Sequence, residues 1–562
     1  MQFNRKKKRI FLNLILAVVF CLGLPFFIAD SSAVQVKKVQ SGAVNFLTDD
    51  LAQSVNLVVD WGGTAVADVA KSLILLTPAA DTSSRDGNFC FTPYFEDNQN
   101  IAILRDLPRT TSAAGATLQV IEFNDGVTVY RGFTSMSKTG KLKTINFTGQ
   151  IANIQDKAFT VVYVRGPINT TADTEVLFCK SSLSSDVNGT YLTLERLRSS
   201  NDAGIAQGIN IAWQVVVLDT DATVRSGTTQ FPWDDADSLW EVTLAPAITD
   251  INKALLIFDY SPGIGINGIE GHMMVKGTIT NTTTLSFTRQ GVGNGSGDYI
   301  DINWKLIEFS DPGTVVTKGT QNMPIVTPPQ VVPVTLPGGL SFDLQRSLSV
   351  ISVQGGLGTT NNYLDDNSVM AKLSSATTLD LTRRQSVIAA DVDWFVVEFS
   401  PLTLTSPNGS EVWKVGETRN ITWKNADSVA SDLVDIKLCA TGSTNIANYT
   451  LTIASGLTAS SGSYAWTIPD SISATNLIGT QLRVAVVDTT LGGTRNYDYS
   501  NTDFEIKGSI AVTAPNGAET WNVGDTTRNI TWNKTGDLSG STFSIRLSED
   551  GGTSYNTVIA DL

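Results

Sequence analysis

The sequence predicts an all-β fold made of tandem β-sandwich domains, and three observations support this class. Short runs rich in β-branched and aromatic residues are separated by clusters of Gly, Asn, Asp and Ser. No window shows a sustained 3.6-residue period of apolar residues, so long helices are not expected. Trp213, Trp304 and Trp394 recur in equivalent strands at spacings of 91 and 90 residues. A period well above about 20–50 residues indicates whole small domains rather than a solenoid.

The first 33 residues have the features of a secretory signal peptide. Residues 5–9 form a basic segment, residues 10–29 an apolar stretch, and residues 31–33 a small-residue cleavage site. An uncleaved anchor is the alternative, because the apolar stretch approaches the roughly 20 residues of a membrane-spanning helix. Pro25 and the cleavage site favour removal. We therefore expect a secreted or cell-surface protein without a membrane span after signal removal.

The chain is acidic. Its formal net charge is −14, and removal of five basic residues and one acidic residue with the signal would leave −18. A surface of this sign, with no basic run, disfavours nucleic acid and anionic lipid as partners. The length of 562 residues predicts several domains, since about 100–200 residues per domain is usual.

Two strand motifs recur in four related repeats. One strand ends in Arg at residues 101–105, 192–196, 285–289 and 379–383, and the other lies at residues 118–123, 213–218, 304–309 and 394–399. About six short strands fit in each unit. Each repeat has a glycine at or near its start, at residues 42, 132, 227 and 319, and the expected domains are residues 36–131, 132–226, 227–318 and 319–401. Because each unit carries a complete set of strands, we expect each repeat to fold alone.

A different pattern begins near residue 401. Residues 405–416 and 419–423 return as residues 513–524 and 528–532, and each copy contains a Pro-Asn-Gly turn. The pattern resembles the immunoglobulin-like domain of the Ser/Thr-rich cell-wall family (KNH type), which occurs in large surface proteins. The resemblance covers residues 402–562 and implies an immunoglobulin-like sandwich without an activity of its own.

The two copies differ in length. We expect one immunoglobulin-like domain over residues 402–507 and a truncated one over residues 508–562, because the second copy has no counterpart of residues 464–466 or 504–506. Half a sandwich would leave strand edges unpaired. A cell-wall anchor, a secretion tail or a catalytic domain would lie beyond Leu562.

No catalytic constellation stands out, so we predict that the chain is not an enzyme. It contains one histidine, His272, which excludes sites built from several histidines and leaves one candidate imidazole for nucleophilic catalysis. No cofactor is predicted. The acidic clusters at residues 233–237 and 365–367 could supply oxygen ligands for Ca²⁺, but neither has the spacing of a calcium loop.

Four equivalent arginines are the candidate ligand-binding residues. Each ends the same strand and precedes a polar loop: Arg105, Arg196, Arg289 and Arg383. A planar guanidinium there could hold a carboxylate or a sugar hydroxyl. The alternative, which we favour, is a structural pairing with the acidic residue of the following strand, Glu122, Glu308 or Glu398.

Three cysteines remain after signal removal: Cys90, Cys179 and Cys439. The later repeats carry Met273 and Met370 in the strands that match the first two, which favours buried apolar positions. A disulfide between domains is the alternative.

We predict a structural or adhesive surface protein whose tandem units form a multivalent stalk or scaffold, since linked weak sites raise avidity. The expected partners are surface glycans or other surface proteins. Carbohydrate recognition by the four repeats is the first alternative. A non-catalytic part of a larger secreted enzyme is the second.

Overall fold

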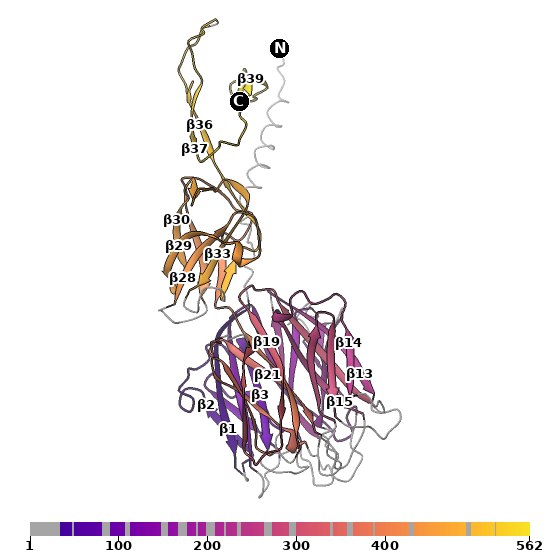
Figure 1. Ribbon diagram of the computed structural model, residues 1–562. Coiled ribbons are helices and arrows are strands. Elements are labelled where there is room, and N and C mark those ends of the chain that lie inside the picture. Colours follow the sequence, from indigo (N-terminus) through magenta and orange to yellow (C-terminus); the bar gives the residue numbers. More distant parts are fainter. Residues whose placement is uncertain are drawn as a thin grey trace, which may run out of the picture.

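The computed structural model has an all-β fold, which confirms the predicted class. It describes residues 34–561 apart from residues 48–49, 81–89, 107–112, 148–155, 167–176, 187–188, 198–207, 219–220, 233–237, 264–272, 291–298, 338–340, 357–363, 386–387, 426–431, 490–495 and 523. Within the described residues the helical elements are short 3₁₀ turns, and none is long and apolar enough to cross a membrane. The strands of the repeats lie side by side, and the immunoglobulin-like domain lies at one end of them (Figure 1).

Each of the four repeats consists of two three-stranded antiparallel sheets with the same strand order. The first repeat has β1 (Gln35–Phe46), β6 (Ala114–Asp125) and β3 (Ser72–Ala80) in one sheet, and β2 (Ala52–Asn56), β5 (Asn100–Leu104) and β4 (Thr92–Phe95) in the other. The second has β7 (Val127–Met136), β12 (Ile209–Leu218) and β9 (Ala158–Arg165), and β8 (Leu142–Asn146), β11 (Gly189–Glu195) and β10 (Lys180–Asp186). The third has β13 (Ala222–Pro232), β18 (Tyr299–Phe309) and β15 (Ala254–Pro262), and β14 (Leu239–Thr243), β17 (Thr284–Arg289) and β16 (Val275–Asn281). The fourth has β19 (Val315–Met323), β24 (Ala390–Glu398) and β21 (Ser347–Gly355), and β20 (Gln330–Thr335), β23 (Thr378–Arg383) and β22 (Met370–Ser375).

The strands divide the chain a few residues before the expected boundaries. The boundaries after residues 131, 226 and 318 fall inside β7, β13 and β19. Each of these strands opens its repeat, so the repeats are separated by the short turns that precede them. The recurring glycine lies within a strand, where it pairs with the last strand of the same repeat.

A tryptophan ring explains why that position is glycine. Gly319 lies opposite Trp394, and a Cβ atom added to Gly319 would lie 2.6 Å from Cζ2 of that ring. Trp213 and Trp304 cover Gly132 and Gly227 in the same way. The first repeat has Leu118 opposite its glycine, Gly42, and there the ring of Trp61 covers the glycine from outside the sheet.

The four repeats form a closed ring. The fourth strand of each repeat packs on the third and last strands of the next: β4 on β9 and β12, β10 on β15 and β18, and β16 on β21 and β24. β22 of the fourth repeat packs in the same way on β3 and β6 of the first. A head-to-tail interface closes into a ring when its rotation permits. The four repeats therefore do not form a row, because the last packs on the first, and the role as a stalk or scaffold stays a prediction.

All four repeats contribute to one central core. The third strands supply equivalent buried residues at the ring axis, namely Leu73, Phe159, Leu255 and Leu348. The last strands close the axis at the end nearest the immunoglobulin-like domain, where the ring centroids of Phe309 and Phe399 lie 5.6 Å apart. Because this core is shared, an isolated repeat would expose an apolar face that the ring buries.

The first immunoglobulin-like unit is a closed sandwich. One sheet has β25 (Leu402–Ser406), β27 (Thr418–Asn425) and β30 (Ser463–Thr467). The other has β26 (Val412–Lys414), β35 (Phe504–Lys507), β33 (Gly479–Asp488), β28 (Leu433–Cys439) and β29 (Leu451–Thr458), with β34 (Tyr497–Tyr499) beside β33. Trp413, Trp423 and Trp466 lie in the core between them.

The second copy forms two separate strand pairs. β36 (Ser509–Ala514) pairs with β37 (Thr531–Thr535), and β38 (Ser544–Leu547) pairs with β39 (Thr557–Asp561). Trp521 is 37% exposed, whereas its counterpart Trp413 is 5% exposed. The described part of this copy therefore does not bury the tryptophan that anchors the first sandwich.

Candidate functional site

The four candidate arginines are structural braces. All are buried, with 0–2% of each residue exposed. The guanidinium of Arg196 donates to the carbonyls of Gly140, Ser137 and Lys138 at 2.7, 2.7 and 2.9 Å. These residues connect the first two strands of the repeat, so the arginine holds that connection against the end of β11.

The equivalent arginines also donate to backbone carbonyls. Arg105 bonds Asp50 and Leu47, Arg289 bonds Pro232, and Arg383 bonds Met323, Asp366 and Ile388. Burial lowers the pKa of Arg383 to about 10, which shows how strongly its charge is desolvated. A guanidinium engaged in this way does not present itself to a soluble ligand.

The expected Arg–Glu pairing within each repeat is wrong. Glu122 bonds Lys37 at 2.9 Å and the N–H of Ala67 at 2.7 Å. Glu308 pairs with Arg225 at 2.8 Å, and Glu398 lies 3.9 Å from Arg346. These glutamates lie near the opposite end of the ring from the arginines. Strand pairing places the arginine and the glutamate of a repeat far apart, although they are close in the sequence.

The remaining sequence candidates are only partly described by the structure. His272 and residues 233–237 lie outside the described residues. Residues 365–367 form a 3₁₀ turn, in which the side-chain oxygen of Asn367 accepts from the N–H of Gly356 at 3.3 Å. Among the side chains that the structure describes, no group of three or more His, Cys, Asp and Glu could hold a metal ion.

The cysteines carry thiols rather than disulfides. Cys179 is buried, Cys90 packs against the same apolar cluster, and Cys439 is buried in the immunoglobulin-like domain. Burial raises the pKa of the Cys179 thiol to about 12, so it stays protonated and unreactive at neutral pH.

One type of hydrogen bond recurs at the ring interfaces. At three of them a backbone N–H of the fourth strand donates to a side chain on the third strand of the next repeat: Ala371 to Thr77 at 3.0 Å, Gly277 to Ser352 at 3.0 Å, and Ser181 to Asp259 at 2.8 Å. The equivalent residue at the remaining interface is Pro93, which has no N–H. There the facing residue is Tyr163, whose hydroxyl accepts from the N–H of Leu76 at 2.8 Å instead.

At two interfaces a glutamine side chain hydrogen-bonds the backbone on the edge of the third strand that has no neighbouring strand. The carboxamide of Gln214 accepts from the N–H of Ile74 at 3.0 Å and donates to its carbonyl at 2.8 Å. Gln119 makes the same pair of bonds with Ser349, both at 2.8 Å. These glutamines supply the hydrogen bonds that a neighbouring strand would otherwise make.

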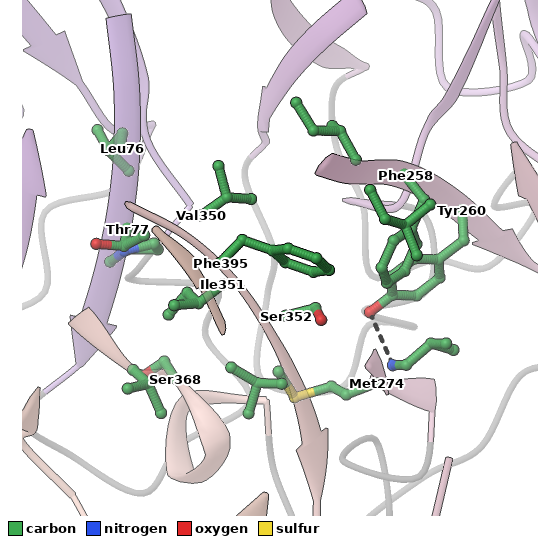
Figure 2. Close-up of a pocket in the computed structure, with 16 residues that line it drawn as sticks. Leu76, Thr77, Phe258, Tyr260, Met274, Val350, Ile351, Ser352, Ser368 and Phe395 are labelled. Carbon is green, nitrogen blue, oxygen red and sulfur yellow. Dashed lines mark hydrogen bonds between the residues drawn. The ribbon is translucent and has the colours of Figure 1, made fainter. Parts of the chain in front are cut away.

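The other two repeats replace this glutamine. Lys305 bonds Asp259 at 2.6 Å and the hydroxyl of Ser181 at 3.1 Å. In the fourth repeat the position is Phe395, which is apolar and lines a cavity (Figure 2). The four interfaces therefore pack equivalent strands together but differ in the side chain that faces the edge of the third strand.

Two adjoining cavities lie at the end of the ring remote from the immunoglobulin-like domain. The first has a volume of about 280 Å³, and Phe258, Val350, Val353 and Phe395 are among its walls. The second, of about 250 Å³, shares Leu76, Pro78 and Tyr260 with the first. Near the other end of the axis lies an apolar void of about 30 Å³. The two larger cavities therefore lie toward the remote end of the ring, and the small void lies nearer the immunoglobulin-like domain.

A polar cavity of about 340 Å³ lies between the ring and the immunoglobulin-like domain. Asp221 and Asp311 from the ring and Asp498 from the domain contribute to its walls. Burial raises the pKa of all three carboxyls, to about 6 for Asp221, and the charge of Asp311 adds to the shift at Asp221 and Asp498. Asp498 accepts from the N–H of Leu404 at 2.7 Å, and Asp311 accepts from the hydroxyl of Thr314 at 2.6 Å.

The fold and these sites define a modular all-β protein, a ring of four sandwich repeats joined to an immunoglobulin-like domain. Residues 406–506 match the family model of the Kre9/KNH-like N-terminal Ig-like domain. This match confirms the resemblance over the first copy and identifies a domain that is typical of cell-wall and surface proteins. A comparison with curated proteins finds no match to the chain.

Proposed function

We propose that the protein is an exported, non-catalytic cell-surface protein in which the ring is a rigid binding head and the immunoglobulin-like domain is the mount that holds it. Surface glycans or other surface proteins are the expected partners. The ring also places four related repeats around one axis, so weak contacts made by several of them would add in avidity.

The junction between ring and domain supports this proposal. Gln35, at the start of the first strand of the ring, donates to the hydroxyl of Thr403 at 2.5 Å and to the carbonyl of Pro401 at 3.4 Å. A Cβ atom added to Gly313, in the turn between the third and fourth repeats, would lie 2.7 Å from the carbonyl oxygen of Tyr497. The start of the ring and the turn between its third and fourth repeats therefore both contact the domain. Contacts at several points would fix the ring on the immunoglobulin-like domain. The remote end of the ring then faces away from that domain.

Carbohydrate recognition through the repeated arginines is not part of the proposal. Their guanidinium groups are buried and occupied by carbonyls, so they favour no sugar site.

Surface labelling of intact cells tests the proposal. The full chain carries a C-terminal epitope tag in its own host, and cells are treated with a biotin reagent that does not cross membranes. We expect the tagged chain to be labelled and to fractionate with the cell surface or the medium. The matched control begins at residue 34 and should stay inside the cell unlabelled. Recovery of the full chain from the cytosol, unlabelled, would reject the proposal.

A further inference from the structure

We propose that the cavity beside Phe395 binds a small, uncharged molecule with an apolar body and a polar end that both donates and accepts a hydrogen bond, such as a primary amide or an alcohol. The site is independent of the arginines and of the proposed surface role. It lies where the third and fourth repeats meet β3 of the first, toward the end of the ring remote from the immunoglobulin-like domain.

The four repeats differ at the residue that follows the tryptophan position. The residue after the tryptophan position is Gln119, Gln214, Lys305 and Phe395 in the four repeats. The two glutamines bond the N–H and carbonyl of Ser349 and Ile74, which lie on the outer edge of a third strand. The register of the sheets makes Leu256 the equivalent of Ile74 and Ser349 in the third repeat.

Phe395 cannot make the hydrogen bonds that the two glutamines make. Its ring has no group that could bond the edge of β15, and Leu256 lines the cavity together with Phe395. The N–H and carbonyl of Leu256 therefore face the space that a glutamine carboxamide occupies at two other interfaces. Buried backbone groups of this kind are almost always paired, and leaving them unpaired is unfavourable. A ligand with one acceptor and one donor would replace the missing carboxamide.

The size and the lining of the cavity indicate what kind of molecule would fit it. The volume of about 280 Å³ lies near the lower end of small-molecule pockets, which span roughly 300–1,000 Å³. In Figure 2 the Phe395 ring points toward Phe258 and Tyr260, and Val350 and Ile351 lie on its other side. The hydroxyl of Thr77 accepts from Ala371, which leaves its hydrogen available to a ligand. An apolar body with a neutral polar end fits these walls, and a charged group would lack a counter-ion among the residues lining this cavity.

Displacement of a neutral fluorescent probe tests the proposal. Purified chain covering residues 34–562 is titrated with N-phenyl-1-naphthylamine, and the bound probe is displaced with octanamide or with 2-nonanone, which accepts a hydrogen bond but cannot donate one. We expect saturable binding of the probe and displacement by octanamide at a concentration up to about tenfold lower than by 2-nonanone, the effect of one net hydrogen bond. Equal displacement by the two compounds, or no saturable binding, would overturn the assignment.

Phe395→Gln is the decisive variant, because it restores the side chain found at two other interfaces. We expect it to lose probe binding by at least about tenfold while its melting temperature stays equal or rises. Val353→Trp fills the same cavity by a different route and should also remove binding. Val331→Trp, at a residue that is 54% exposed on β20, is the matched control and should bind as the unmodified chain does. Unchanged binding in Phe395→Gln would place the probe elsewhere and reject the site.

Discussion

The backbone N–H of Ala371 in the fourth repeat donates to the hydroxyl of Thr77 in the first, at 3.0 Å and across 294 residues of sequence. The same bond joins the third repeat to the fourth through Gly277 and Ser352. The contact that links consecutive repeats therefore also links the last to the first. A single interface, used repeatedly, closes the ring and leaves no terminal repeat with an unused face.

The ring should be the unit that folds. Residues 222–309, the third repeat alone, should give no cooperative thermal transition, because the ring buries Leu255 and Leu256 of this repeat in a core shared with its neighbours. Residues 34–400 should unfold cooperatively. Circular dichroism melts of the two fragments check this. A cooperative melt of the single repeat would instead support the expectation from the sequence that each repeat folds alone.

Gly319→Ala should destabilise the protein. The new Cβ would lie 2.6 Å from the ring of Trp394, and the buried ring cannot move without disturbing the sandwich core. We expect a loss of about 1–3 kcal/mol in the free energy of unfolding, measured in denaturant. Gly479→Ala is the control, since a Cβ there would meet no atom within 4 Å. Equal stability of both variants would mean that the fit of Trp394 against Gly319 is looser than the distances indicate.

Arg196→Met should lower stability without affecting any binding to surface material. The change removes the guanidinium that donates to the carbonyls of Gly140, Ser137 and Lys138, at a residue that is only 1% exposed. The expected loss in the free energy of unfolding is about 1–3 kcal/mol. Lys should recover only part of it, because it lacks the planar fork.

The control for this substitution is Arg419→Met, whose side chain is 48% exposed and pairs with Glu417 on the surface. It should change stability by less than about 1 kcal/mol. A stable Arg196→Met variant that had lost binding to surface glycans would return the arginines to the list of ligand-binding residues.

The junction between ring and immunoglobulin-like domain should weaken as pH rises. Burial raises the pKa of Asp221 to about 6 in the folded protein, above the value near 4 of an unfolded Asp. The protonated form is thus favoured by folding, and its contribution is complete below the unfolded pKa and is lost as pH rises through about 6. Asp311 and Asp498 shift in the same direction.

Thermal melts of residues 34–508 at pH 5 and pH 8 check this prediction. The melting temperature should be higher at pH 5, and Asp221→Asn should reduce the difference because it removes one titrating carboxyl. Asp550, which is exposed and far along the chain from the junction, offers the control substitution Asp550→Asn in the full chain. A pH dependence unchanged by Asp221→Asn would exclude this carboxyl as its source.

Sequence reasoning reached the elements that depend on local pattern. The recurring Arg strand and Trp strand are β23 and β24 in the fourth repeat, and the Pro-Asn-Gly unit begins a true immunoglobulin-like sandwich. It misplaced the repeat boundaries, because a glycine inside a strand looks the same in sequence as one in a turn. Only the pairing of Gly319 with Trp394 shows which it is.

By itself, the sequence determined the all-β class, the number of repeats and the identity of the immunoglobulin-like domain, because alternation of side chains and turn chemistry act over a few residues. Only the tertiary structure decided that the repeats close into a ring, that the arginines bond carbonyls, and that Phe395 lines a cavity whereas Gln214 bonds the edge of β3. The physical reason is that a head-to-tail interface can build a line, a helix or a ring. The choice depends on the rotation between neighbouring repeats, which side chains far apart in the sequence set together.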